Sequence, residues 1–225
     1  MCPILGTSVS DLMSAGKPAP EAQEPKAHRS GLILAGGRST RFGGGDKAIK
    51  PVDGQPMICR ARDALKASGV DEIIVSVRDE AQRALQAPVL HEHLPFVVDE
   101  LHEIGPMAGL LAGLSAAHGE YVVVVACDMP FISPEIIFLL LQAAEGHDAA
   151  VPVREKGYVE PLHAVYRREP AIAAIKKATG AGNSRVAAVL HYLVDVVYVP
   201  VESLRKIDPE LRTFANINRA EDLPP

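Results

Sequence analysis

A short apolar run and the glycine-rich stretch after it are the most informative part of the chain: Gly31-Leu32-Ile33-Leu34-Ala35-Gly36-Gly37-Arg38-Ser39-Thr40-Arg41-Phe42-Gly43-Gly44-Gly45-Asp46-Lys47. The apolar run has the length of a buried strand. Five glycines occupy the ten positions from Gly36 to Gly45. Glycine lets backbone N–H groups turn toward one point and approach an anion closely. The stretch therefore predicts a strand that ends in an anion-binding loop.

Positive charge is concentrated in the same loop, in a chain whose net charge is −5. Four cationic residues lie in the loop or just beyond it, and only Asp46 offsets them: Arg38, Arg41, Lys47 and Lys50. Clustered cations in an acidic protein favour a polyphosphate ligand. The loop is not a P-loop, because Asp46 separates Gly45 from Lys47 and Ala48 stands where a hydroxyl is needed. The dinucleotide-binding fingerprint G-x-G-x-x-G is not present after this strand either.

Apolar strand-like runs alternate with helical patterns along the rest of the chain. We expect strands at residues 31–35, 72–77, 95–99, 121–126, 149–153, 161–166 and 194–199, and helices at 57–67, 79–85, 107–117, 134–144, 170–178 and 184–191. This alternation predicts an α/β fold with three layers and a mostly parallel central sheet. Ligands bind at the carboxyl ends of the strands of such sheets, so we expect the chemistry in the loops after Ala35, Val77, Val98 and Ala126.

Composition excludes several classes of function. The negative net charge, the aromatic content of 4% and the absence of Trp argue against nucleic acid as a partner. No apolar run approaches the roughly 18 residues of a membrane helix. Three cysteines without a C-x-x-C spacing predict neither a disulfide framework nor a structural zinc site, which favours a cytoplasmic protein. Residues 1–30 contain the stretch 17–25, which is rich in Pro, Ala and Glu and has no periodic apolar face, so we expect a disordered tail over 1–30 and a single domain over 31–225.

Carboxylates follow two of the expected strands. Asp128 comes after the unbroken apolar run 121–126, and Asp99 closes the preceding strand. A carboxylate at the ligand edge of the sheet suits Mg²⁺, which takes one or two protein carboxylates together with phosphate oxygens and waters. The alternative for Asp128 is a turn-forming helix cap, a task that Ser133 already fulfils. We interpret the neighbouring Cys127 as a buried strand residue, since no paired base accompanies it.

Four motifs of this chain resemble those of the molybdenum cofactor guanylyltransferases, members of the MobA-like nucleotidyltransferases. Leu34–Lys47 is similar to the family pattern L-A-G-G-x-S-x-R-[MF]-G-G-x-D-K, and Glu103–Leu110 contains G-P-[LM]-A-G-[LMI]. Cys127–Ile132 is similar to C-D-[MT]-P-[FY]-[IVL], and Phe214–Leu223 to a C-terminal pattern N-[IV]-N-[TR]-x-E-[DE]-L. The four motifs stand in the family's order and cover about residues 31–223.

The resemblance implies a Rossmann-like nucleotidyltransferase fold and Mg²⁺-dependent transfer of GMP from GTP to the terminal phosphate of molybdopterin, with release of pyrophosphate. It implies catalytic roles for Arg41, Lys47 and Asp128, with Mg²⁺ on Asp128. The nucleotide contacts that it implies are Leu34, Ala35, Gly36, Gly37, Lys47, Ser76, Asp99 and Asp128. The acceptor contacts that it implies are His163, Asn216 and Asn218. A core role for His163, and local turn roles for the two asparagines, are the alternatives.

The identity of the base and of the acceptor stays open at this point. The stretch Leu34–Gly37 favours GTP, since related cytidylyltransferases usually read L-A-A-G, but Ser76 stands where the family often has an Asn that helps to read guanine. A cytidylyltransferase, or a transferase for cobinamide phosphate or a sugar phosphate, is the second interpretation. A non-catalytic nucleotide-binding protein is the third, and it would not need Asp128. The expected partners are GTP and molybdopterin, with transient contacts to proteins that supply molybdopterin or use the cofactor.

Overall fold

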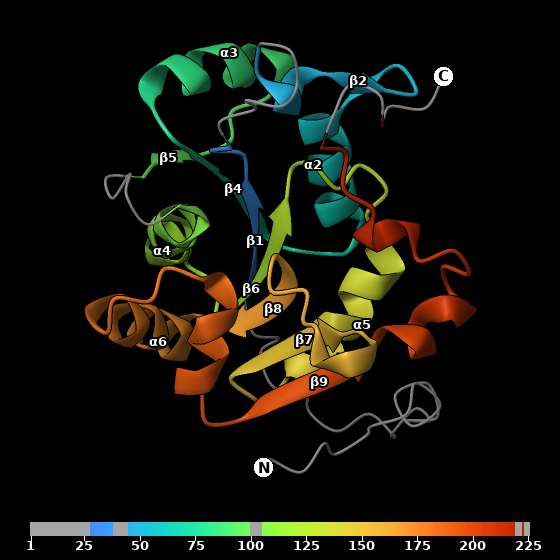
Figure 1. The fold of residues 1–225 in the computed structure, drawn as a ribbon. Helices are drawn as coiled ribbons and strands as arrows, with labels where there is room; N and C mark the ends of the chain where they lie inside the picture. Colours follow the sequence, from blue (N-terminus) through green and yellow to red (C-terminus); the bar gives the residue numbers. More distant parts are fainter. Residues whose placement is uncertain (1–27, 38–44, 100–104, 219–221, 223–225) are drawn as a thin grey trace, which may run out of the picture.

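A seven-stranded sheet forms the centre of the computed structural model, which describes residues 28–37, 45–99, 105–218 and 222 (Figure 1). Its strand order is β5-β4-β1-β6-β8-β7-β9. The strands are β1 (Arg29–Leu34), β4 (Glu72–Val77), β5 (Phe96–Val98), β6 (Tyr121–Ala126), β7 (Ala149–Val153), β8 (His163–Arg167) and β9 (Val196–Pro200). β8 runs antiparallel to both of its neighbours, whereas the other pairs are parallel. The predicted mostly parallel sheet is confirmed.

Helices cover both faces of this sheet, as Figure 1 shows. The helices α2 (Met57–Ala67), α3 (Glu80–Leu90) and α5 (Pro134–Ala144) pack on one face, and α4 (Pro106–Ala116) and α6 (Arg168–Gly180) on the other. Short 3₁₀ helices complete the chain: η1 (Lys47–Ile49), η3 (Glu155–Gly157), η4 (Val186–Tyr192), η5 (Val201–Lys206) and η6 (Arg212–Phe214). None of the helices within the described ranges is long and apolar enough to cross a membrane.

The central strands bury both of their faces. In β1, Leu32 packs with the α4 and α6 layer, whereas its neighbour Ile33 packs with the α2 and α5 layer. Val124 and Val125 of β6 divide between the two layers in the same way. All four side chains are fully buried. Strands that are covered on both faces read as continuous apolar runs, which explains why the run 121–126 was recognisable in the sequence.

The structure differs from the sequence-based expectations in several places. Helix α3 continues to Leu90, beyond the expected end at 85, and the helix expected at 184–191 is the 3₁₀ helix η4. A small hairpin of β2 (Pro51–Val52) and β3 (Gln55–Pro56) was not expected, although the Asp53-Gly54 dipeptide at its tip is a strong hairpin signal. Asp53 and Gly54 have φ values of 49° and 78°, as this type of turn requires. The sheet also begins at Arg29, so the folded domain starts before residue 31. Residues 1–27 of the expected tail lie outside the described residues.

Candidate active site

A cleft of about 840 Å³ opens at the carboxyl ends of the central strands. The chain passes from β1 outward to β4 and β5, and then returns to place β6 on the other side of β1. The strand order therefore reverses between β1 and β6, which is where open α/β sheets bind their ligands. The first strand and the strand before Asp128 are neighbours in the sheet and pair in parallel.

Backbone hydrogen bonds extend the sheet just past the ends of these strands. The Ala35 N–H donates to the Ser76 carbonyl at 2.8 Å, and the Cys127 N–H donates to the Leu34 carbonyl at 3.1 Å. The Asp99 N–H donates to the Val77 carbonyl at 3.0 Å. Because these bonds hold the strand ends at one level, the loops after β1, β4, β5 and β6 all begin at the floor of the cleft.

An ion pair joins two of these loops. The Lys47 Nζ lies 2.5 Å from Oδ2 of Asp128, and the two side chains are 15% and 18% exposed. Lys47 is the first residue of η1, which Asp46 caps by accepting a hydrogen bond from the Ala48 N–H. The main chain at Asp128 is held as well, since its carbonyl accepts a hydrogen bond from the Ile217 N–H at 2.8 Å. The predicted cation and the predicted metal ligand therefore lie in direct contact.

Two glycines allow parts of the site to approach closely. A Cβ at Gly36 would lie 3.2 Å from the backbone nitrogen of Arg78, so a larger residue would push the first turn of the loop away from β4. A Cβ at Gly109 would lie 2.8 Å from the Ser76 hydroxyl oxygen, so a larger residue would force the Ser76 side chain to move. Glycine at these positions keeps the loop and helix α4 tight against β4.

Most of the residues singled out from the sequence line this one cleft: Leu34, Gly36, Gly37, Lys47, Ser76, Asp99, Asp128 and Asn216. Ala35 is buried and takes part in the site only through its backbone. Asn218 is exposed outside the cleft lining, and its N–H donates to the Asp222 carboxylate. Arg41 lies outside the described residues.

His163 does not line the cleft, and this corrects its expected direct contact with the acceptor. Its side chain is completely buried on β8, opposite Val125 of β6. The ring packs edge-on against Phe214, with 4.9 Å between ring centroids, and Nε2 lies 3.4 Å from the Thr213 hydroxyl oxygen. Burial lowers the pKa of His163 to about 4, so the ring is neutral near pH 7. It belongs to the core that supports the C-terminal segment.

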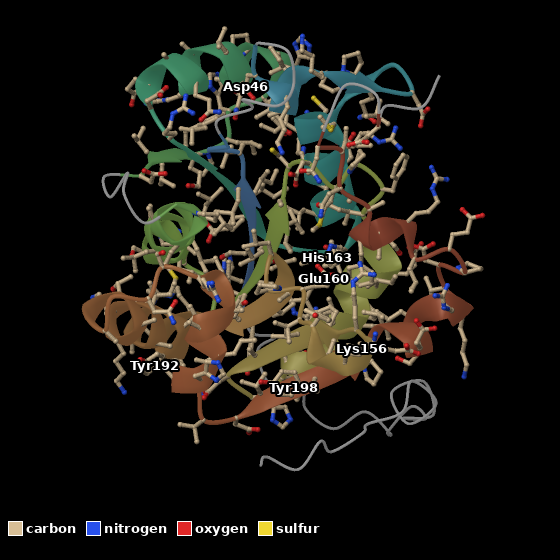
Figure 2. The ribbon with its side chains drawn as sticks, in the orientation of Figure 1. Asp46, Lys156, Glu160, His163, Tyr192 and Tyr198 are labelled. Atoms are coloured by element: carbon tan, nitrogen blue, oxygen red, sulfur yellow. The ribbon has the colours of Figure 1, made fainter. Side chains whose placement is uncertain are left out.

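Sequence reasoning missed three charged residues that line the cleft: Arg78, Glu160 and Arg185. Glu160 is paired with Arg154 and enters from the loop before β8, close to His163 in Figure 2. Arg185 enters from the turn between α6 and η4 and is exposed. A glycine-rich run at 180–184 precedes Arg185 and was the available signal for a loop at this position.

Cysteine chemistry and a preformed metal cluster are both unsupported. Cys127 is 3% exposed, and burial raises the pKa of its thiol, as expected for a structural residue. Among the residues that the structure describes, no group of three or more His, Cys, Asp or Glu side chains could hold a metal ion. The cleft offers the carboxylates of Asp128 and Asp99 instead.

Comparisons with known proteins point in one direction. Residues 31–196 match the MobA-like NTP transferase domain family. The chain is 42% identical over 205 residues to a protein of Methanosarcina mazei named probable molybdenum cofactor guanylyltransferase, covering 89% of this chain and 91% of that protein. It is 36% identical to a molybdenum cofactor guanylyltransferase of Desulfosudis oleivorans, over 86% of this chain and 92% of that protein. The crystal structure of molybdopterin-guanine dinucleotide biosynthesis protein A from Archaeoglobus fulgidus superposes with a TM-score of 0.71 at 32% identity, covering 86% and 94% of the two chains.

Proposed function

This chain belongs to the MobA-like NTP transferase family, and we propose that it transfers GMP from GTP to the terminal phosphate of molybdopterin. The products are pyrophosphate and the guanine dinucleotide form of the molybdenum cofactor. The observation that carries the proposal is the contact between Lys47 and Asp128 in the cleft between β1 and β6. It joins a phosphate-binding cation to a metal-binding carboxylate at the place where this fold binds nucleotides.

The reaction is a displacement at the α-phosphorus of GTP. An oxygen of the acceptor's terminal phosphate forms the new bond to this phosphorus. The bond from the phosphorus to the oxygen that bridges the α- and β-phosphates breaks, and its electron pair leaves with pyrophosphate. Because the attacking phosphate is already ionised, no general base is needed. Catalysis then consists of positioning and of stabilising the charge on the departing pyrophosphate.

The glycine-rich loop supplies this stabilisation in our proposal. The backbone amides after Gly36 and Gly37 bind the triphosphate, and Lys47 donates to the oxygens of the departing pyrophosphate. Arg41 is assigned the same role by its place in the loop motif, and its position lies outside the described residues. The location of Lys47 supports its proposed role as a donor to the pyrophosphate. Its partly buried ammonium group faces the cleft beside the first turn of the loop.

The cleft residues fit a divalent cation that arrives with the nucleotide. Nucleotidyltransferases of this kind are generally metal-dependent. Asp128 presents a partly exposed carboxylate, and Asp99 lines the same cleft. One or two carboxylates with the rest of the shell from phosphates and water is the usual arrangement for Mg²⁺, which we propose as the metal on Asp128. When bound there, Mg²⁺ would neutralise the triphosphate charge that the loop cations leave uncompensated.

The two ends of the cleft divide between the two substrates. We assign the nucleotide to the side of β1, β4 and β5, where Leu34, Ser76 and Asp99 lie. The backbone of Ala35, directly after β1, is part of the same side. We assign molybdopterin to the rest of the cleft, which is lined by Asn216 and by Glu160 of the loop before β8. The serine at position 76 is the observation that keeps a cytidylyltransferase as the second candidate. We also propose transient contacts with proteins that supply molybdopterin or receive the cofactor.

We place the enzyme in the cytoplasm. Cys59 and Cys127 are both free thiols in the structure, which fits a reducing compartment. The substrates of the proposed reaction are small molecules, and the acidic composition gives no support for nucleic acid as a partner.

Isotope labelling tests the proposed reaction. GTP labelled at the α-phosphate should transfer its label to the molybdopterin product, and GTP labelled at the γ-phosphate should release its label as pyrophosphate. Each molecule of product should accompany one molecule of pyrophosphate. Label from the γ-position on the acceptor, or nucleotide bound without any turnover, would contradict the proposal.

A further inference from the structure

We propose that Gln82 and Gln86 of α3 are positioning residues that hold both ends of the glycine-rich loop and thereby set the direction of Lys47. The inference rests on the proposed function, because it concerns the same nucleotide site. Neither glutamine belongs to a motif of the sequence, and neither lines the cleft. Both are nevertheless buried, with 5% and 0% of their surface exposed, and they stand one helical turn apart on the same face of α3.

Gln82 holds the first end of the loop. Its side-chain Nε2 donates to the Gly37 carbonyl at 3.3 Å, and its Oε1 accepts a hydrogen bond from the Arg78 N–H at 3.0 Å. One side chain thus links the loop after β1 to the loop after β4. Both loops contribute to the floor of the cleft, so this link fixes the distance between them.

Gln86 holds the loop at both ends. Its Nε2 donates to the Ala35 carbonyl at 3.2 Å and to Oδ2 of Asp46 at 2.7 Å. Asp46 is itself 8% exposed, and its other oxygen accepts from the Ala48 N–H at 2.9 Å. Figure 2 shows Asp46 close to α3, at the opposite end of the molecule from Tyr192 and Tyr198. The residue after Asp46 is Lys47, so the anchored carboxylate sets the turn from which Lys47 reaches Asp128.

The chemistry of these residues indicates that the anchoring has a function. Burying an amide costs free energy unless its hydrogen bonds are made, and apolar side chains would pack the same helix face without this cost. Gln86 even leaves its Oε1 buried without a partner among the described residues. Its bonds and those of Gln82 go to the loop and to the neighbouring strand end. Side chains that fix a loop in this way prepare its donors for the transition state before the substrate arrives.

The first test replaces each glutamine by leucine, which has a similar volume and no polar atoms. Gln86→Leu and Gln82→Leu should each lower kcat/KM for GTP by about 10- to 100-fold, as expected for a misplaced catalytic group. The KM for molybdopterin should stay within about twofold, because the acceptor side of the cleft is untouched. The matched control is Arg83→Leu on the same helix, since Arg83 is exposed and its bonds go to Glu80. All assays are run well below each variant's melting temperature.

The second test exchanges the hydrogen-bond donor and acceptor between residues 86 and 46. Gln86→Glu places a carboxylate against the Asp46 carboxylate and should be worse than Gln86→Leu. Adding Asp46→Asn restores a donor facing an acceptor and leaves an oxygen for the Ala48 N–H, so the double variant should recover at least about tenfold in kcat/KM. Lowered melting temperatures with unchanged kinetics, or a double variant no better than Gln86→Glu, would overturn the inference. Absence of GMP transfer in the unmodified protein would refute the proposed function instead.

Discussion

The ammonium group of Lys47 lies 2.5 Å from the carboxylate of Asp128, although the two residues are 81 positions apart in the sequence. In the proposed reaction the two groups act on different partners, since Lys47 binds phosphate oxygens and Asp128 binds the metal. Without nucleotide, each group neutralises the other. We therefore expect the carboxylate to bind a metal ion weakly until the triphosphate provides a new partner for Lys47.

This relationship predicts opposite effects of Lys47→Met on metal binding and on catalysis. In the nucleotide-free protein, affinity for Mn²⁺ should rise by about tenfold or more, because a competing cation has been removed from the carboxylate. Turnover should fall by one to three orders of magnitude, as for the loss of one stabilising group. Electron paramagnetic resonance measures the free Mn²⁺. Lys50→Met, in the same loop, is the control and should leave Mn²⁺ affinity unchanged, and equal affinities in all three proteins would refute the competition.

Asp128→Asn keeps the shape of the side chain and removes its charge. The fold should persist, because the hydrogen bond from the Ile217 N–H is made to the backbone carbonyl of residue 128. Metal-free GTP binding should persist in part, whereas Mg²⁺-dependent transfer should fall by at least about 100-fold and recover only in part at high Mg²⁺. A Mg²⁺ titration of pyrophosphate release measures this. Superimposable curves for the variant and the unmodified protein would make Asp128 a structural residue.

Burial of His163 predicts an acid-sensitive fold. The pKa of His163 is about 4 in the folded protein and near its ordinary 6.5 in the unfolded chain. The unfolded state therefore binds more protons between these values, and stability is lost as the pH falls from 6.5 toward 4. The loss from this one group amounts to about 3 kcal/mol by pH 4. Denaturant unfolding measures the free energy of unfolding at pH 7 and pH 4. Between these pH values it should fall by about 3 kcal/mol less for His163→Phe than for the unmodified protein.

The start of β1 predicts where the chain can be shortened. A chain that starts at His28 should melt within a few degrees of the full-length protein. A chain that starts at Gly31 loses the ion pair of the buried Arg29 with the exposed Glu145, and the Ser30 hydroxyl that bonds Glu72 and the Gly119 N–H. Loss of these contacts should lower the melting temperature by roughly 5–10 °C. Calorimetry of both chains checks this, and equal melting temperatures would show that residues 29 and 30 contribute nothing.

The elements best predicted from sequence are those whose signals are local. Strands β4, β6 and β7 have the bounds that were expected, because their apolar runs are local, and helices α2 and α5 also have the expected bounds. Ser133 caps α5 by accepting from the Ile136 N–H, with Pro134 at the first helical position. The antiparallel direction of β8 has no such local signal. It depends on pairing with β6, which is more distant in the sequence, and with β7, the strand just before β8 in the chain.

The site was predictable to the extent that it follows from strand order. Lys47 and Asp128 come together because each follows a strand and these two strands are neighbours. His163 was harder to place, because its role depends on register. It lies opposite Val125, whose side chain packs in the layer of α2 and α5, so the histidine is directed into that core. Gln82 and Gln86 carry no motif, and only the packing of α3 against the loop reveals them.

The central claim is that this cleft catalyses guanylyl transfer to molybdopterin. The most direct test is the rate of pyrophosphate release with each of ATP, CTP, GTP and UTP, in the presence and absence of molybdopterin, for the unmodified protein and Asp128→Asn. The account predicts release that requires both GTP and molybdopterin, is at least about tenfold slower with the other nucleotides, and is largely lost in the variant. Equal or faster release with CTP, release that is independent of molybdopterin, or full activity of Asp128→Asn would contradict it.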